Sequence, residues 1–297
     1  MLRPFLVLSA LALLGCIGDS SGGVVDPGES DSDQGLPFET HKDLVFSPGL
    51  WMNLYVPKKG TQPFPAVVLI HGGGWSSGTR GDFLPEALHL ASNGLVAGTI
   101  DYRLAPAHVF PAALQDVKAA IRWLRANADA YSIDASQIAV MGGYEGGHLA
   151  AMVGTTEGVA QFEGEENPGY SSAVQAVVAI SSQVDLPSLW SGGAGKGVLA
   201  IERFLGSSYQ EDPALWAIAS PISYVSQASA PFLLLHGIED TEVPFAHAEG
   251  MRDALMAAGA HVELFSAQGG DHEFFFSVLW NAPGLEAITD FFTRILK

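Results

Sequence analysis

Groups capable of acid–base and electrostatic chemistry follow three apolar runs of the sequence. The segment His71 to Trp75, with glycine at its three middle positions, comes directly after the run 66–70. Consecutive glycines free the backbone to turn its N–H groups toward one point, as an oxyanion hole requires. Asp240 and His272 each follow a later apolar run. A carboxylate and then an imidazole in these places fit the orienting and proton-shuttling members of a hydrolase triad.

Strand and helix patterns alternate around these residues. Short apolar runs, typical of strands buried on both faces, recur at 66–70, 95–100, 138–141, 174–180, 232–235 and 262–265. Helical spacing of apolar residues appears between or after them, most clearly at 111–128, 245–258 and 285–296. This alternation predicts an α/β fold with a mostly parallel sheet covered by helices. Such sheets carry their sites beyond the carboxyl ends of the strands, which is where the reactive groups stand.

Together these segments resemble the α/β-hydrolase superfamily, in the esterase branch related to hormone-sensitive lipase and to the feruloyl and acetylxylan esterases. The resemblance covers about residues 53–297 and includes the segments 204–206, 219–222 and 231–244. It implies the α/β-hydrolase fold, with a mainly parallel central sheet and helices on both faces. It also implies cleavage of carboxylic esters through an acyl-serine, with no metal and no cofactor.

The resemblance assigns roles to particular residues. Asp240 would be the triad acid and His272 the base. The backbone N–H groups of Gly73 and Gly74 would form part of the oxyanion hole. The backbone N–H of Glu145, in the turn discussed next, would complete it.

The nucleophile position departs from this family's pattern. The family places a serine in a G-x-S-x-G turn between strand and helix, whereas the turn here has Tyr144 in the serine's place, between Gly142 and Gly146. Glu145 also stands where the family usually has a small residue. A bulky side chain at positive φ costs about 1–3 kcal/mol. Because a phenol hydroxyl lies farther from the backbone than a serine hydroxyl, Tyr144 should overshoot the point where His272 and the oxyanion donors converge.

The residues leave three functional outcomes open. The first is weak or altered hydrolysis of small or aromatic esters, for example by direct attack of water with His272 as base. The second is a catalytically silent pseudo-hydrolase that binds a small-molecule ligand, and the third is efficient catalysis with Tyr144 as nucleophile. A relocated nucleophile is a further possibility, although none of its candidates sits on a strand–helix turn of the required kind. These candidates are Ser76, Ser77, Ser181 and Ser182.

Other residues near these motifs have structural interpretations. We expect His148 to pack or cap its helix and His71 to shape the glycine loop. Asp101 and Asp116 are expected to fix the loop and helix beside the site. The tryptophans considered for an acyl or aromatic pocket are Trp75, Trp190 and Trp216. The sequence has no His-x-x-x-His pair, and its one cysteine lies outside the domain, so no metal site is expected.

The first residues predict export and a lipid anchor. Residues 1–15 match a signal peptide, because Arg3 precedes an apolar run too short to cross a bilayer. The segment Leu13 to Cys16 resembles the bacterial lipobox, in which the cysteine is acylated after cleavage. The alternative is an ordinary secretory signal with an incidental cysteine. We therefore predict an exported bacterial lipoprotein, anchored through Cys16 on the periplasmic or cell-surface side of a membrane.

Composition separates a tether from a domain. Residues 16–37 are rich in Gly, Ser and acidic residues and predict a lipidated cysteine followed by a flexible tether, with the α/β-hydrolase domain at 38–297. The 297-residue chain has 14 Lys and Arg against 32 Asp and Glu, a formal charge of −18. This charge argues against nucleic acid as a partner and against docking on anionic lipid through side chains. The expected partners are a small ester or related ligand, and a membrane reached only through the Cys16 lipid.

Overall fold

The computed structural model of the protein describes residues 36–191 and 195–296. The predicted signal peptide, Cys16 and almost all of the predicted tether therefore lie outside the described residues. The first strand begins at Phe38, and Gly35 to Lys297 form one compact unit. In the described part of the chain, no helix has both the length and the apolar character needed to cross a membrane.

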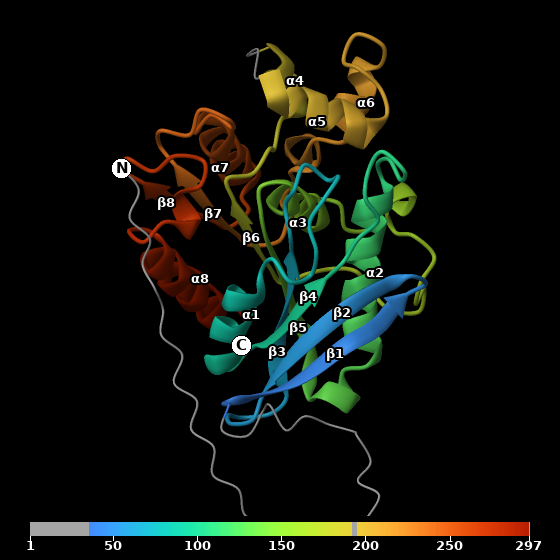
Figure 1. The fold of residues 1–297 in the computed structure, drawn as a ribbon, viewed down its shortest axis with the longest axis vertical. Coiled ribbons are helices and arrows are strands. Elements are labelled where there is room, and N and C mark those ends of the chain that lie inside the picture. The colour runs from blue at the N-terminus through green and yellow to red at the C-terminus, as the bar shows by residue number, and fades with distance from the viewer. Residues whose placement is uncertain (1–35, 192–194, 297) are drawn as a thin grey trace, which may run out of the picture. The chain divides into compact units, whose positions relative to one another are not determined.

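One eight-stranded sheet forms the centre of this unit, in the order β1-β2-β4-β3-β5-β6-β7-β8 (Figure 1). Neighbours from β4 to β8 pair in parallel, whereas β1 pairs antiparallel with β2 and β2 antiparallel with β4. The predicted α/β class with a mostly parallel sheet is confirmed. The strands are β1 (Phe38–Ser47), β2 (Leu50–Pro57), β3 (Phe64–Ile70), β4 (Val96–Ile100), β5 (Ile133–Gly143), β6 (Ala176–Ile180), β7 (Phe232–Gly237) and β8 (Val262–Ala267).

Helices cover both faces of the sheet. The α-helices are α1 (Leu84–Ser92), α2 (Ala112–Ala126), α3 (Glu145–Thr155), α4 (Leu186–Ser191), α5 (Gly195–Leu205), α6 (Pro213–Ile218), α7 (Ala246–Ala258) and α8 (Asn281–Ile295). The short 3₁₀ helices are η1 (Asp129–Tyr131), η2 (Ala160–Phe162), η3 (Pro221–Tyr224) and η4 (Phe274–Phe276). In Figure 1, α4, α5 and α6 lie together at the top of the view, above α3.

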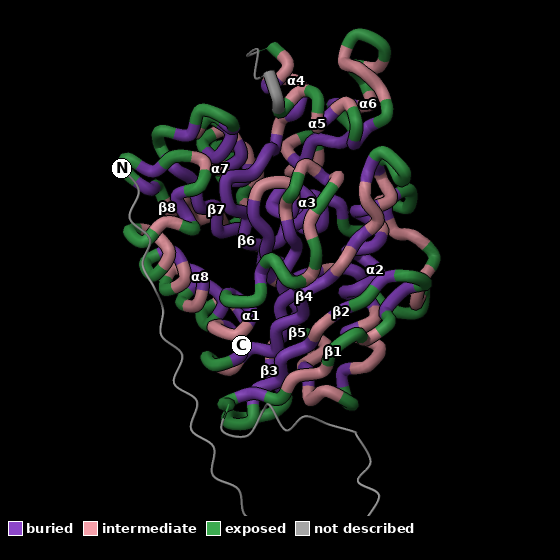
Figure 2. The backbone as a smooth tube through the Cα atoms, viewed as in Figure 1, coloured by how far each residue is buried: buried purple, intermediate pink, exposed green. Residues whose placement is uncertain are grey.

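The alternation of side chains along each strand produces two cores. In β3, Val68 and Ile70 join the cluster that includes α2, α3 and α7 residues, whereas Val67 and Leu69 join the cluster with α1 and α8 residues. Successive strand side chains point to opposite faces, so a strand buried on both faces reads as a continuous apolar run. Figure 2 shows the buried backbone concentrated along these central strands. Both cores lie within the unit that starts at Gly35.

Two parts of the fold differ from the sequence-based expectation. Strands β1 and β2 were not among the predicted strands, and α8 begins at Asn281 rather than near Leu285. The added turn contains Pro283, which is compatible with a first turn because the N–H groups there have no acceptor inside the helix. Strand β1 is an edge strand with a largely polar sequence and few buried side chains, so it gives no apolar run to detect.

Candidate active site

The turn between β5 and α3 has the backbone geometry of a nucleophile elbow. Tyr144 stands at its apex with φ 57° and ψ −117°, so the predicted positive φ is confirmed. The Tyr144 N–H donates to the carbonyl of Ile180 at 2.8 Å. A Cβ at Gly146 would lie 2.1 Å from the Ile70 carbonyl oxygen, and one at Gly142 would lie 2.3 Å from the Gly146 carbonyl carbon. Glycine is required at both positions because strand and helix approach so closely.

The Tyr144 side chain passes the imidazole that it would need for activation. Its ring lies 4.5 Å from the His272 ring, centroid to centroid, with 39° between the planes. Its hydroxyl donates to Oε2 of Glu273 at 2.7 Å. Burial, followed by the hydrogen bond and charge of Glu273, raises the pKa of the phenol far above its usual range. Tyr144 is therefore a neutral hydrogen-bond donor, and the overshoot predicted from its length is confirmed.

Asp240 and His272 form the expected pair. Nδ1 of His272 lies 2.7 Å from Oδ2 of Asp240. Burial on its own would lower the pKa of His272, but the hydrogen bond and charge of Asp240 outweigh it and raise that pKa. Because Nδ1 is bound to the carboxylate, Nε2 is the nitrogen left for proton transfer, as in a serine hydrolase triad.

A second imidazole, which the sequence did not identify as functional, also contacts the triad carboxylate. Nε2 of His236 lies 3.1 Å from Oδ2 of Asp240 and 2.8 Å from the Val243 carbonyl. The other carboxylate oxygen accepts the N–H groups of Glu242 and Val243 at 2.9 and 2.8 Å. Burial alone would raise the pKa of Asp240, yet these partners, the two imidazoles first, hold it well below its usual range. The signal for His236 was its place at the end of β7, four residues before the acid.

The glycine loop lies directly against the elbow. A Cβ at Gly72 would be 3.1 Å from Cδ2 of Tyr144 and 3.2 Å from Oε2 of Glu145. Gly73 and Gly74 have φ of 96° and 65°. Within the described residues, no protein acceptor binds the N–H groups of Gly73, Gly74 or Glu145. The loop and the elbow that carry the three predicted oxyanion donors thus lie against each other. None of the three N–H groups is occupied by an acceptor from the described residues.

Side chains hold the glycine loop in this shape. The Tyr102 hydroxyl donates to the His71 carbonyl at 3.0 Å, and Nδ1 of His71 is 2.9 Å from the Gly72 carbonyl. The predicted role of His71 in shaping the loop agrees with this contact. Asp101 accepts hydrogen bonds from Arg80, and Asp116 accepts them from Arg103 at 2.8 and 2.9 Å, so both acids fix segments beside the site.

The Glu145 carboxylate is a feature for which sequence reasoning found no role. Its Oε1 accepts from Nε2 of Gln183 at 3.3 Å, while Oε2 lies over the glycine loop. Its negative charge contributes to raising the pKa of both Tyr144 and His272. An anion developing beside the Gly73 and Gly74 N–H groups would be repelled by this carboxylate. The site therefore holds a fixed negative charge close to the glycine loop.

Three of the four alternative serines donate their hydroxyls to backbone carbonyls. Ser76 donates to Gly74 at 2.7 Å and Ser77 to Gly73 at 2.8 Å. Ser181 donates to the His272 carbonyl at 3.1 Å, so it braces the loop that carries the base. Ser182 is buried beside the elbow helix, where it would contact a Cβ at Gly147. In the described part of the chain, none of these four hydroxyls hydrogen-bonds to the His272 imidazole.

His148 and two of the tryptophans belong to the core. The His148 ring packs edge-on against Trp75 and Phe204, and its Nε2 is 2.7 Å from the Ala219 carbonyl. Burial lowers the pKa of His148 to about 4. Of the two expected roles, His148 therefore has the packing role, because α3 has no side-chain cap hydrogen bond. Trp75 and Trp216 are fully buried, so they line no open pocket. The tryptophan that remains partly exposed, Trp190, stacks on Tyr209 at 4.4 Å.

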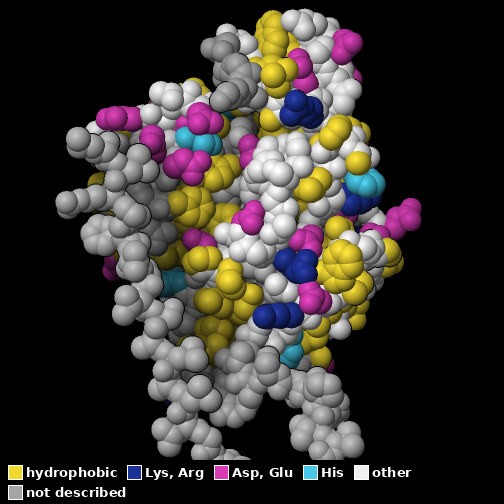
Figure 3. Space-filling view, viewed as in Figure 1, with side chains coloured by type: hydrophobic (Ala, Val, Ile, Leu, Met, Phe, Trp, Pro, Cys, Tyr) yellow, Lys and Arg dark blue, Asp and Glu magenta, His cyan; other side chains and the backbone are white. Residues whose placement is uncertain are grey.

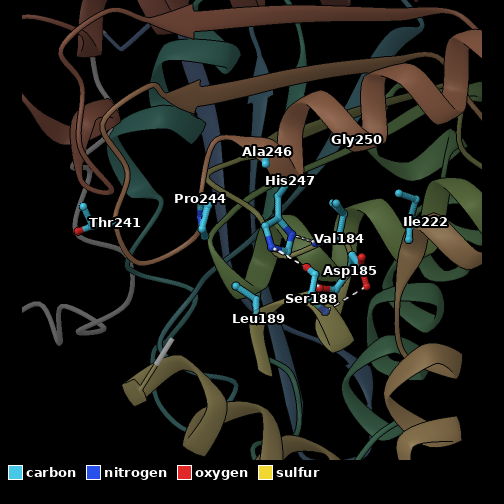
Figure 4. A pocket seen from close by; sticks show the side chains of 10 residues that line it. All are labelled: Val184, Asp185, Ser188, Leu189, Ile222, Thr241, Pro244, Ala246, His247 and Gly250. Atoms are coloured by element: carbon cyan, nitrogen blue, oxygen red, sulfur yellow. Dashed lines mark hydrogen bonds between the residues drawn. The ribbon is translucent and has the colours of Figure 1, made fainter. Parts of the chain in front are cut away.

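A cavity of about 520 Å³ lies beside the loop of the triad acid (Figure 4). Its lining includes Thr241, next to Asp240, and a Ser188–His247 pair whose Oγ and Nε2 are 3.2 Å apart. The Val184 N–H donates to Nδ1 of His247 at 3.3 Å, so the ring proton is on Nε2 and points at Ser188. Burial lowers the pKa of His247 to about 4. The ring therefore donates to Ser188, and the pair is not a second nucleophile and base.

No group of three or more His, Cys, Asp or Glu side chains suited to a metal ion occurs in the described part of the chain. The acid–base groups of the site are thus the Asp240–His272 pair with His236 behind it, and the carboxylates of Glu145 and Glu273. This constellation, at the carboxyl ends of β3, β5, β7 and β8, defines the chain as an α/β-hydrolase-fold protein with Tyr144 at the apex of the β5–α3 turn.

Comparison with known proteins identifies the family. The BD-FAE family model matches residues 52–255, and the chain belongs to this family. It is 35% identical over 217 residues to "Esterase LipC" of Mycobacterium tuberculosis, covering 72% of this chain and 54% of that protein. It is 31% identical over 233 residues to "Esterase LipQ" of the same organism, covering 76% of this chain and 54% of that protein. The chain thus spans about half the length of these curated relatives.

Solved structures of esterases share the fold. A truncated carbohydrate esterase from gut microbiota superimposes with a TM-score of 0.76 at 26% identity, covering 88% of this chain and 97% of that one. The butyrate-bound esterase Est2 of the planctomycete Thermogutta terrifontis gives a TM-score of 0.72 at 26% identity, covering 87% and 94%. The α/β-hydrolase fold is therefore shown, and the relatives that share it are esterases.

Proposed function

We propose that this chain is a carboxylic-ester hydrolase of small or aromatic esters whose turnover is weakened by Tyr144. The observation that carries the proposal is the intact Asp240–His272 pair beside Gly73 and Gly74 N–H groups that bind no acceptor among the described residues. His272 takes a proton from a water molecule whose oxygen attacks the ester carbonyl, and the N–H groups stabilise the oxyanion that forms. As the acyl C–O bond breaks, the protonated His272 gives its proton to the departing alcohol oxygen, leaving the carboxylic acid and the alcohol. Enzymes stripped of triad members still exceed the uncatalysed rate by roughly 10³–10⁴-fold through such donors and substrate binding.

A specific observation favours the second candidate, a catalytically silent ligand-binding protein. The Tyr144 hydroxyl is fixed on Glu273 and cannot serve His272 as a nucleophile, and the Glu145 carboxylate opposes an oxyanion. Hydrolysis of p-nitrophenyl acetate and butyrate by the purified protein separates the two candidates. Turnover that His272→Ala abolishes supports the hydrolase. Equal rates for wild type and His272→Ala support the silent binder.

The pH dependence of any hydrolysis should report His272. A general base works only when it is deprotonated, so kcat/KM is expected to fall as the pH falls through the pKa of its imidazole. Because the net shift raises that pKa above the ordinary 6.5, the loss begins at a higher pH than for an unperturbed histidine. Measuring kcat/KM between pH 5 and 9, roughly the window around that pKa, checks this. A profile flat through neutrality would contradict the role of His272.

We also propose the lipid anchor on Cys16 and export to the periplasmic or cell-surface side of a membrane. The support is the lipobox-like segment 13–16 and the position of the one cysteine of the chain. Cys16→Ser is expected to move the protein from the membrane fraction to the soluble fraction of the cells that produce it, because one thiol carries the acyl chains. Fractionation with immunodetection, with Ser20→Ala as the control, measures this. An unchanged membrane share for Cys16→Ser, measured in protein that also carries Val278→Glu and Leu279→Glu to remove two exposed apolar side chains, would count against lipidation.

A further inference from the structure

The segment that follows the catalytic base is uncharged and rich in aromatic residues. From Phe274 to Leu285 the sequence contains no Asp, Glu, Lys or Arg, although Glu273 and Glu286 flank it. The segment runs through η4 into the first turns of α8.

The start of this segment is buried, whereas the turn that follows faces solvent. Phe274 and Phe275 are in the core, whereas Phe276 is 44% exposed, Leu279 70% exposed and Val278 fully exposed. Leu84, at the start of α1, is 39% exposed and follows Phe83, whose ring is 6.0 Å from that of Phe276. We name Leu84, Phe276, Val278 and Leu279 the rim patch. Hydrophobic side chains also gather on the face shown in Figure 3, between α1 and β8.

The turn that carries the rim patch is held by its own hydrogen bonds. Ser277 donates its hydroxyl to the Phe274 carbonyl at 2.6 Å, and the N–H of Asn281 donates to the Ser277 carbonyl at 3.0 Å. The Asn281 amide also donates to the Phe275 carbonyl at 3.1 Å. The exposed side chains are therefore presented on a fixed backbone, which lowers the entropy cost of using them in binding.

The rim patch is continuous with the candidate active site. The Phe276 ring lies 6.0 Å from the Tyr144 ring, which in turn packs on His272. Val278 and Leu279, in contrast, are not among the residues that line the cavity of Figure 4, and their side chains are the most exposed of the rim patch. An apolar turn that projects from the surface is suited to insert into a lipid layer. It is less suited to enclose a small ligand.

We propose that the rim patch docks the domain on an electrically neutral lipid surface, with Val278 and Leu279 entering the interface and Trp280 behind them. Four side chains cannot supply the roughly 800 Å² per partner that a stable protein interface buries. Tryptophan and large apolar side chains are the residues that lipid interfaces accept. The acidic domain would be repelled by anionic headgroups, and the uncharged tip has no cation to attract them. This docking would bring Phe276, and the Tyr144 ring beside it, close to the lipid and requires no turnover.

Vesicle sedimentation tests the proposal with residues 35–297, which contain both cores and lack the predicted anchor. Wild type should bind phosphatidylcholine vesicles, and the double variant Val278→Glu/Leu279→Glu should partition at least about tenfold more weakly. The uncharged double variant Val278→Ser/Leu279→Ser should also weaken binding. Comparing it with the Glu double variant separates the effect of lost apolar area from the effect of added charge. The matched control is Met256→Glu on α7, because Met256 is 63% exposed but lies outside the patch. It should bind as wild type does.

A spectroscopic readout and several outcomes complete the test. Vesicles should shift the tryptophan emission of wild type to shorter wavelength, and Trp280→Phe should remove most of that shift. Circular dichroism establishes that each variant is folded. The proposal is overturned if wild type and the Glu double variant bind equally, or if phosphatidylglycerol vesicles bind better than phosphatidylcholine. Lipid-free self-association that the double variant abolishes would instead assign the patch to a second copy of the chain.

Discussion

Replacement of Tyr144 by serine is expected to raise ester hydrolysis at least about a hundredfold, because misplacement of a reacting group by ~1 Å already costs about that factor. The elbow, the Asp240–His272 pair and the glycine loop are all in place around Tyr144. A serine hydroxyl at this apex would lie on the near side of the His272 ring rather than on Glu273. The measurement is kcat/KM for p-nitrophenyl acetate and butyrate.

Tyr144→Phe is the matched control for this experiment. It keeps the ring against His272 but removes the hydroxyl that donates to Glu273. We expect Tyr144→Phe to hydrolyse esters no faster than wild type does. If Tyr144→Phe abolished wild-type turnover, Tyr144 would be the nucleophile after all. If Tyr144→Ser gained nothing while remaining folded, the assignment of this position to the nucleophile would be wrong.

Asp240→Asn in the Tyr144→Ser protein should lower kcat by about 10⁴-fold, the loss that such a change causes in a serine protease triad. Asp240 binds Nδ1 of His272 at 2.7 Å and keeps Nε2 free to accept the serine proton. An amide in its place can donate to Nδ1 and favour the wrong tautomer. The change should leave KM nearly unaltered because it acts on proton transfer.

His236 supplies a control for this second prediction. His236→Gln keeps a donor near Asp240 but removes the second imidazole, 3.1 Å from Oδ2. We expect its effect on kcat to be far smaller than that of Asp240→Asn, since it does not touch the base. An equal loss in both variants would mean that the carboxylate acts mainly by holding its own loop together. Thermal melting of both variants distinguishes that explanation.

Sequence patterns predicted the parts of the fold and of the site that depend on residues close together in the chain. The central strands were visible because burial on both faces leaves continuous apolar runs, as in β3. The elbow was visible because strand–helix contact forces glycine at Gly142 and Gly146. The edge strand β1 was not visible, because its burial is decided by pairing with β2 and not by its own sequence.

The side-chain partners within the site could not be predicted in the same way. That Tyr144 would end on Glu273, and that the Glu145 carboxylate would lie over Gly72, depends on how loops far apart in sequence approach one another. The packing of Trp75 and Trp216 in the core likewise follows from tertiary contacts. Sequence reasoning identified which residues meet at the strand ends, and the structure determines what each of them touches.

The tight fit of Gly142 and Gly146 around the elbow has a genetic consequence. At Gly142 and Gly146 the neighbouring backbone leaves no room for even a methyl group. A tyrosine at the apex does not itself require either glycine, yet both are present beside Tyr144. Each tyrosine codon differs from one serine codon by a single base, so one point mutation would place a hydroxyl of serine length at the apex of this turn. Selection for growth on an ester as carbon source would therefore be expected to recover that mutation first at codon 144.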